Sequence, residues 1–201
     1  MVPEPRPHRH PRTARDGMAA LTLDPAIALL VVVCAALLFA AAALHKLQAP
    51  RRFEEIFAAY GLLPLAFGRR ASRAVPLLEA VVAGGLLFAG SRTAAACVGI
   101  GLLLGYAGAI AVNLRRGRRD LACGCGGPDD RRPIASWMVW RNIGIAVLLA
   151  AALLPWSGRP LVLTDAVTIG FGTATGALLY LCLDTLLGRT GRVTDELRIH
   201  P

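Results

Sequence analysis

Long apolar runs separated by short basic segments dominate the chain. Residues 26–44 contain no charged or strongly polar side chain. This run of 19 residues is close to the ~20 that a helix needs to cross the hydrocarbon core of a bilayer. Further apolar stretches occupy residues 74–90, 93–112, 137–156 and 162–187. The pattern predicts an all-α, polytopic membrane helix bundle within residues 24–187, with four core spans and a fifth.

The two ends of the chain have a different composition. Residues 1–23 are rich in proline and arginine and poor in apolar residues, which predicts a disordered basic segment. We expect residues 188–201 to form a polar tail. The run at 26–44 exceeds the ~7–15 apolar residues of a signal peptide core, so the first span is expected to be uncleaved.

The connection after the first span contains its own periodic pattern. Phe53, Ile56, Phe57 and Tyr60 follow the spacing i, i+3, i+4 and i+7, which places them on one helical face. Charged residues occupy the opposite face, and Pro64 follows as a stop signal. We expect a short amphipathic helix here, lying on the membrane surface.

Two pairs of glycines fall within the predicted spans. Gly101 and Gly105 are four residues apart, and so are Gly172 and Gly176. This spacing allows helices to approach closely, either within the bundle or between two copies of the chain.

The composition supports a membrane protein and argues against a nucleic-acid-binding one. Hydrophobic residues make up 55% of the chain and charged residues only 17%, with a net charge of +9. The basic residues lie between the apolar runs, and no aromatic-rich basic face accompanies them. We therefore expect the lipid bilayer of the cell membrane, and not nucleic acid, to be the partner of these charges.

The basic residues are divided unequally between the two membrane faces that five spans create. One face receives six of them, and the other receives fifteen, in the first connection, the third connection and the tail. The positive-inside rule predicts that the face with fifteen is cytoplasmic.

Polar and ionisable residues within or beside the spans converge on this fifteen-charge face. They are His45, Lys46, Glu79, Asn113 and Arg141. Glu79 lies five residues inside the second span, which corresponds to a depth of roughly 8 Å. Charges at such depth are costly without a partner. We therefore expect Glu79 to be ionised and paired with Lys46 or Arg141, unless both cations extend to the headgroups instead.

Cys123 and Cys125 lie in the third connection, separated by one glycine. A disulfide between them closes a ring of about eleven atoms, which is strained. Strained disulfides are readily reduced and tend to be catalytic or regulatory. Nearby arginines are expected to favour the thiolate. A zinc site with His45 as third ligand and a chemically inert cysteine pair are the alternatives; we expect neither a metal nor a cofactor.

These residues together resemble the MauE-type branch of the DoxX-like redox-associated membrane proteins. The resemblance covers roughly residues 25–156, although family members often carry an aromatic residue where this chain has Gly126. It is carried by His45-Lys46, the Phe53 to Tyr60 segment, Pro64, Pro76-Leu77-Leu78-Glu79, Asn113-Leu114-Arg115-Arg116-Gly117-Arg118, Cys123-Gly124-Cys125-Gly126, Ser136-Trp137 and Arg141-Asn142.

The resemblance implies a function in redox maturation. MauE proteins are associated with maturation of the disulfide-rich small subunit of methylamine dehydrogenase, alongside a thioredoxin-like partner. We therefore expect Cys123 and Cys125 to exchange disulfides with such a partner, supported by the polar residues. A non-catalytic membrane scaffold that anchors a redox enzyme is the main alternative. A transporter using Glu79 is less consistent with five spans that show no inverted repeat.

Overall fold

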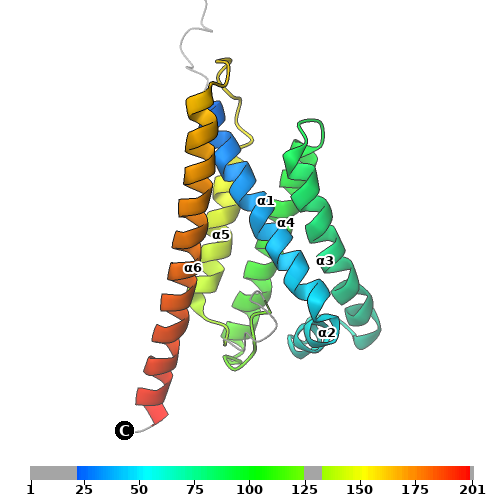
Figure 1. Cartoon of the computed structure of the whole chain (residues 1–201). Coiled ribbons are helices and arrows are strands. Elements are labelled where there is room, and N and C mark those ends of the chain that lie inside the picture. The colour runs from blue at the N-terminus through cyan, green and yellow to red at the C-terminus, as the bar shows by residue number, and fades with distance from the viewer. Residues whose placement is uncertain (1–21, 125–132, 200–201) are drawn as a thin grey trace, which may run out of the picture.

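The computed structural model describes residues 22–124 and 133–199, and the described residues form six α-helices (Figure 1). They are α1 (Pro25–Gln48), α2 (Pro50–Ala59), α3 (Leu65–Leu87), α4 (Arg92–Arg115), α5 (Ser136–Ala151) and α6 (Leu163–Ile199). Within these ranges the only extended pairing consists of two isolated β-bridges. The all-α class predicted from the apolar runs is therefore confirmed.

The helices agree in part with the predicted spans. By length and composition, α1, α4 and the Leu163–Leu186 part of α6 can each cross a membrane, which makes this a multi-pass membrane protein. The apolar helix α5 is shorter, with 16 residues. Helix α3 begins well before the predicted run at 74–90, so its first turns carry arginines. Most of the N-terminal segment, residues 1–21, lies outside the described residues.

The C-terminal helix is longer than its apolar run. α6 continues to Ile199, through most of the segment that was expected to be a tail. Figure 1 shows this extension reaching beyond the other helices at the end of the bundle where α2 lies.

Four helices, α1, α3, α4 and α5, share one apolar core. Most of its side chains are small, which allows helix backbones to approach closely. Its buried members are Val32, Ala35, Ala36, Phe39, Val82, Ala83, Leu86, Ala95, Ala96, Leu103, Ala146, Leu149 and Ala152. Phe39 is the one large aromatic ring among them, and a Cβ at Gly99 would come within 3.0 Å of it. Gly99 therefore provides the space that the ring occupies.

Helix α6 packs on the outside of this core, against α1. A Cβ at Gly172 would come within 3.0 Å of the Leu30 side chain, and Gly176 lies on the same face of α6. This glycine pair therefore serves packing within the chain. At Gly101 and Gly105, by contrast, a Cβ would meet no described atom within 4 Å.

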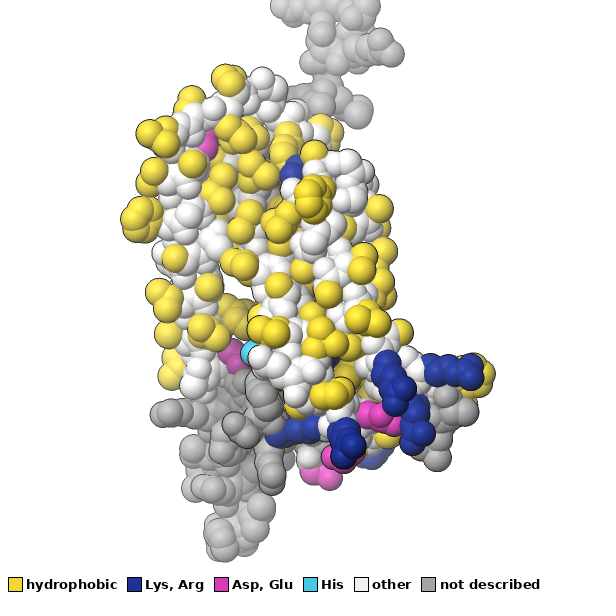
Figure 2. All heavy atoms as spheres, turned by 45° about the vertical axis from the view of Figure 1, so that its right-hand side comes forward, with side chains coloured by type: hydrophobic (Ala, Val, Ile, Leu, Met, Phe, Trp, Pro, Cys, Tyr) yellow, Lys and Arg dark blue, Asp and Glu magenta, His cyan; other side chains and the backbone are white. Residues whose placement is uncertain are grey.

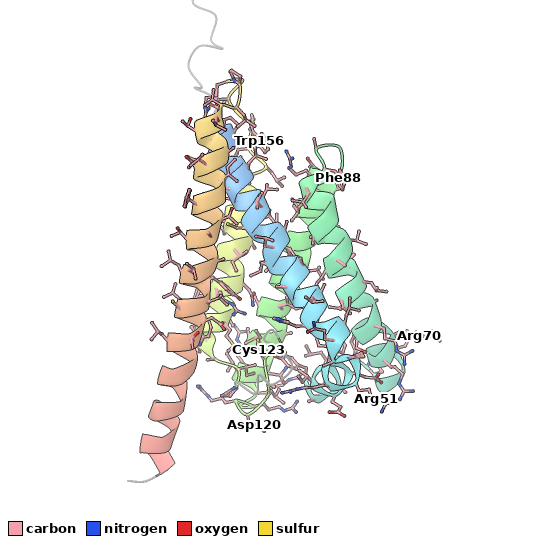
Figure 3. The ribbon with its side chains drawn as sticks, in the orientation of Figure 1. Arg51, Arg70, Phe88, Asp120, Cys123 and Trp156 are labelled. Carbon is pink, nitrogen blue, oxygen red and sulfur yellow. The ribbon has the colours of Figure 1, made fainter. Side chains whose placement is uncertain are left out.

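The two ends of the bundle differ in charge. Figure 2 shows hydrophobic side chains along the flank and most of the visible Lys and Arg side chains gathered at one end. Cys123 lies at this end together with Arg51 and Arg70, whereas Phe88 and Trp156 lie at the other end (Figure 3). The basic segments and the first cysteine of the Cys-Gly-Cys sequence therefore share one end of the molecule.

The predicted amphipathic helix is present as α2, and part of its apolar face packs on protein. The ring of Phe53 lies 5.2 Å from the Lys46 ammonium at the end of α1. Ile56 contacts the position of Gly124, and Tyr60 is buried. The reason is that the described part of the third connection folds back toward α2, where Gly124 lies against Ile56 and Arg118 donates to Ala59.

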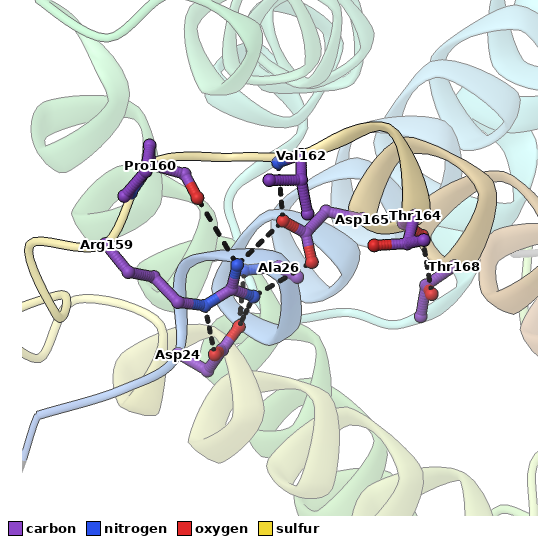
Figure 4. A network of polar contacts seen from close by, with 8 residues as sticks. All are labelled: Asp24, Ala26, Arg159, Pro160, Val162, Thr164, Asp165 and Thr168. Carbon is purple, nitrogen blue, oxygen red and sulfur yellow. Dashed lines mark hydrogen bonds and ion pairs between the residues drawn. The ribbon is translucent and has the colours of Figure 1, made fainter.

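At the opposite end, Arg159 connects the starts of α1 and α6 (Figure 4). Its guanidinium donates to both carboxylate oxygens of Asp24 at 2.8 Å and to those of Asp165 at 2.7 and 2.9 Å. Asp24 also accepts from the backbone N–H of Ala26 and thereby caps α1. The hydrogen bonds from Arg159 are the main reason that the pKa of Asp24 lies below its ordinary value.

We predict that Arg159→Gln lowers the melting temperature of the detergent-solubilised protein by about 2–4 °C, because both carboxylates lose a bidentate donor. Since the pKa of Asp24 is lowered in the fold, this contribution is present above pH 3.8 and is lost as the pH falls through the folded-state value. The melting temperature of the wild type should therefore fall more steeply on acidification than that of Arg159→Gln. Parallel pH profiles for the two proteins would refute this role of the arginine.

Candidate functional site

A buried ion pair joins α1 to α3 near the charged end of the bundle. The ammonium of Lys46 donates to Oε1 of Glu79, and the two side chains are only 6% and 0% exposed. The hydroxyl of Tyr106 on α4 donates to the same oxygen at 2.7 Å. The sequence left Lys46 and Arg141 as alternative partners for Glu79, and in the structure the partner is Lys46.

Two aromatic rings enclose the Lys46 ammonium. The ring centroids of Tyr106 and Phe53 lie 5.0 and 5.2 Å from Nζ, within the range of cation–π attraction. Sequence reasoning did not single out Tyr106. Tyr106 lies seven residues before Asn113 and therefore on the same face of α4. This spacing could have identified Tyr106 as a neighbour of the polar residues.

The end of α4 is shaped by the segment Asn113–Arg118. Gly117 has φ +76°, and the N–H groups of Gly117 and Arg118 donate to the carbonyls of Leu114 and Asn113. This is the Schellman arrangement, which requires a left-handed residue and therefore favours glycine. The turn directs the guanidinium of Arg118 to the carbonyl of Ala59 at 2.7 Å, at the end of α2. Arg118 thus connects the third connection to α2.

Asn113 is fully buried at this turn. Its side-chain Nδ2 donates to the carbonyl of Ala109 at 3.1 Å, and its Oδ1 accepts from Arg118 at 3.3 Å. Asn113 is therefore a structural element of the turn that precedes the cysteines.

The loop that carries the cysteines is closed at its base. Ala122 and Pro133 form an antiparallel bridge, and the N–H of Ile134 donates to the carbonyl of Leu121 at 2.9 Å. Leu121 and Ile134 are buried in a second apolar cluster with Tyr60, Ile110 and Met138, and Cys123 packs against this cluster. The first cysteine is thus fixed at the end of the bundle, and Cys125 lies outside the described residues.

Gly124 rests directly on α2. Its φ of +71° lies in the left-handed region, and a Cβ there would come within 3.2 Å of Ile56 and 3.8 Å of the Phe53 ring. Phe53 therefore contacts the Lys46 ammonium and also lies beside the Cys-Gly-Cys backbone. The ion pair and the cysteine loop, which are far apart in sequence, adjoin one another through this side chain.

Arg141 and His45 belong to a different part of the molecule. Arg141 donates to Asp184 of α6 at 2.9 Å, and both side chains are about 85% buried. The guanidinium also lies 5.2 Å from the Trp137 ring and 5.7 Å from the Tyr180 ring. The Nδ1 atom of His45 is buried and has no hydrogen-bond partner among the described residues.

The site residues thus form two groups with different properties. Lys46, Glu79 and Tyr106 form a closed polar group, whereas Cys123 supplies a thiol beside an apolar cluster. Among the upstream arginines expected to favour the thiolate, Arg118 donates to Ala59 and Asn113. In the part of the chain that the structure describes, no three His, Cys, Asp or Glu side chains are placed to hold a metal ion.

Comparison with known proteins identifies the family. The family described as methylamine utilisation protein MauE matches residues 24–156. A methylamine utilization protein MauE from Paracoccus denitrificans is 33% identical over 181 residues, 88% of this chain and 96% of the relative. One from Methylophilus methylotrophus is 33% identical over 85% of this chain and 91% of the relative. No solved structure matches. The chain therefore belongs to the MauE family of methylamine utilisation proteins.

Proposed function

We propose that this protein is a membrane thiol-disulfide component that assists the maturation of a partner protein in methylamine utilisation. The relatives' names support the metabolic context. The Cys-Gly-Cys sequence supports dithiol chemistry, because two thiols so close together can form and release a strained disulfide. The partner that exchanges with them is a thioredoxin-like protein.

One observation carries the proposal: the cysteine loop rests on a rigid support. Gly124 packs on Ile56, Cys123 packs against the second apolar cluster, and the base of the loop is closed by a β-bridge. Reactive pairs benefit from such support, because exchange requires both sulfurs to be held within reach of an incoming disulfide.

The exchange proceeds in two steps. The thiolate of one cysteine attacks the disulfide of the partner, which forms a mixed disulfide and releases one partner thiolate. The thiolate of the second cysteine then attacks the mixed disulfide. This forms the Cys123–Cys125 disulfide and releases the second partner thiolate, so that the pair is oxidised and the partner is reduced. The reverse sequence oxidises the partner.

The polar group has a positioning function in this proposal. Lys46 is held by Glu79 and Tyr106, and its ammonium attracts the ring of Phe53. Phe53 also lies beside Gly124 and so provides part of the surface on which the loop packs. Asn113 fixes the turn before the loop. Arg141 joins α5 to α6 through Asp184.

We further propose that α3 and α5 cross the membrane together with the three longer apolar helices. Both helices share the alanine-rich core with α1 and α4, and a helix within such a core cannot lie outside the bilayer that surrounds its neighbours. The bundle then has five spans in the cell membrane, and the Cys-Gly-Cys loop lies at one membrane face.

The exchange mechanism predicts a trapped intermediate. Replacing the resolving cysteine prevents the second step, so one of Cys123→Ser and Cys125→Ser should accumulate an adduct with a thioredoxin-like protein. Non-reducing gel electrophoresis of membranes, followed by mass spectrometry, detects this adduct and its loss on reduction.

Serine variants at Cys34, Cys97 and Cys182 are the controls, because these residues lie on α1, α4 and α6 away from the loop. They should form no adduct. If both loop variants keep full activity and neither forms an adduct, the dithiol mechanism is wrong and a non-catalytic scaffold is the better description.

The buried ion pair predicts non-additive mutations. Glu79→Gln and Lys46→Met each remove one charge of the pair and leave the other charge buried without its counter-charge, which costs about 3–5 kcal/mol for a fully buried pair. The double variant should lose less stability than the sum of the two, measured by thermal unfolding in detergent. The pair Arg69 and Glu54 is the matched control, because it is exposed and its removal should have little effect. Additive losses at Lys46 and Glu79 would contradict the coupling.

The charge distribution predicts that the cysteine loop faces the cytoplasm. A membrane-impermeant maleimide applied to intact cells under reducing conditions should therefore not label Cys123 or Cys125. Gly90→Cys is the control for the opposite face, because Gly90 is exposed in the connection between α3 and α4, and it should be labelled. The reverse labelling pattern would place the loop outside, where disulfides persist.

A further inference from the structure

An outward-facing surface lies where α2 turns into α3. We call it the basic elbow. It consists of four exposed arginines and three exposed apolar side chains: Arg51, Arg69, Arg70, Arg73, Leu62, Leu63 and Phe67. Figure 2 shows the basic side chains of this region gathered at the lower edge of the bundle.

The elbow has a fixed shape. Gly61, with φ +60°, ends α2, and Pro64 begins the turn into α3. The Nε atom of Arg69 then donates to Glu54 of α2 at 2.7 Å, which ties the two helices together across the turn. The arginines are therefore presented by a braced turn and not by a loose loop.

The apolar side chains of the elbow do not contribute to the core. Leu62, Leu63 and Phe67 are 41%, 50% and 64% exposed. On the other face of α2, Gly124 already lies against Ile56 and Phe53. On α3, Phe67 shares one helical stripe with Leu77 and Val81, which are 58% and 69% exposed. This stripe continues the lipid-facing flank of the bundle into the elbow.

Positive charge lies within this apolar stripe. Arg70 falls between Phe67 and Leu77 on the same face of α3, and Arg73 is one turn further along. Among the described residues, Arg69 has an acidic partner, whereas Arg51, Arg70 and Arg73 have none. Residues 50–73 contain five arginines and two glutamates, so the segment keeps a surplus of positive charge.

We propose that the basic elbow binds the phosphate groups of anionic phospholipids in the adjacent leaflet. At the membrane surface, exposed arginines can bind the phosphates of the headgroups, and the apolar side chains beside them can contact the acyl chains. Guanidinium groups bind phosphate through paired hydrogen bonds. This inference concerns lipid selectivity and does not depend on the proposed redox function.

The test uses the full chain reconstituted in phosphatidylcholine vesicles with a trace of spin-labelled lipid. Electron paramagnetic resonance measures how much of the label is immobilised at the protein surface. Spin-labelled phosphatidylglycerol should associate several-fold more strongly than spin-labelled phosphatidylcholine. The preference should fall at high salt, because it is electrostatic.

Arg70→Gln combined with Arg73→Gln should remove most of this preference, because these two exposed arginines lie beside the apolar stripe of α3 and have no acidic partner among the described residues. Arg115→Gln combined with Arg116→Gln is the matched control. These arginines are exposed at the same end of the bundle, outside the apolar stripe of α3, and the control should keep the preference.

Three results would overturn the proposal: equal association of the two lipids, an equal loss in both double variants, or displacement of the lipid by inorganic phosphate at matched ionic strength. The last result would indicate a site for free phosphate. Circular dichroism of each variant verifies that its helical content is unchanged before the lipids are compared.

Discussion

The buried pair of Lys46 and Glu79 is the interaction on which the arrangement of this bundle depends. The shared core is rich in alanine. Small side chains allow close packing, but they do little to fix the axial register of neighbouring helices. A charge at this depth, by contrast, is stable only beside its partner. Because Glu79 accepts from both Lys46 and Tyr106, this one carboxylate sets the register of α1, α3 and α4 together.

The position of α2 and of the cysteine loop follows from this register. The Lys46 ammonium attracts Phe53, and Phe53 and Ile56 together form the surface on which Gly124 lies. Arg118 connects the third connection to α2 by donating to the carbonyl of Ala59 at the end of that helix. The loop is thereby supported by contacts with α2, which is distant in sequence, and a change at Glu79 should reach it through Phe53.

Sequence reasoning located the polar residues but not all of their contacts. A cationic partner for Glu79 could be expected in advance, because an intramembrane charge demands one, but the sequence left Lys46 and Arg141 as alternatives. The contacts of Arg141 with Asp184 and of Phe53 with Gly124 could not be expected in advance. The contact between Arg141 and Asp184 could be predicted only by knowing that α6 packs against α1 and brings Asp184 next to Arg141 of α5. The contact between Phe53 and Gly124 could be predicted only by knowing that the third connection folds back toward α2. The apolar periodicity of α2 does not reveal this, because it fits packing on protein as well as contact with lipid.

Hydrogen–deuterium exchange of the detergent-solubilised protein tests most directly whether the ion pair supports the loop. Glu79→Gln should accelerate exchange in α2 and in residues 119–124, while Arg159 and the start of α6, at the other end of the bundle, remain protected as in the wild type. Glu54→Gln, which removes an exposed carboxylate of α2 itself, should leave residues 119–124 unchanged. Unaltered exchange of the loop in Glu79→Gln would contradict the account.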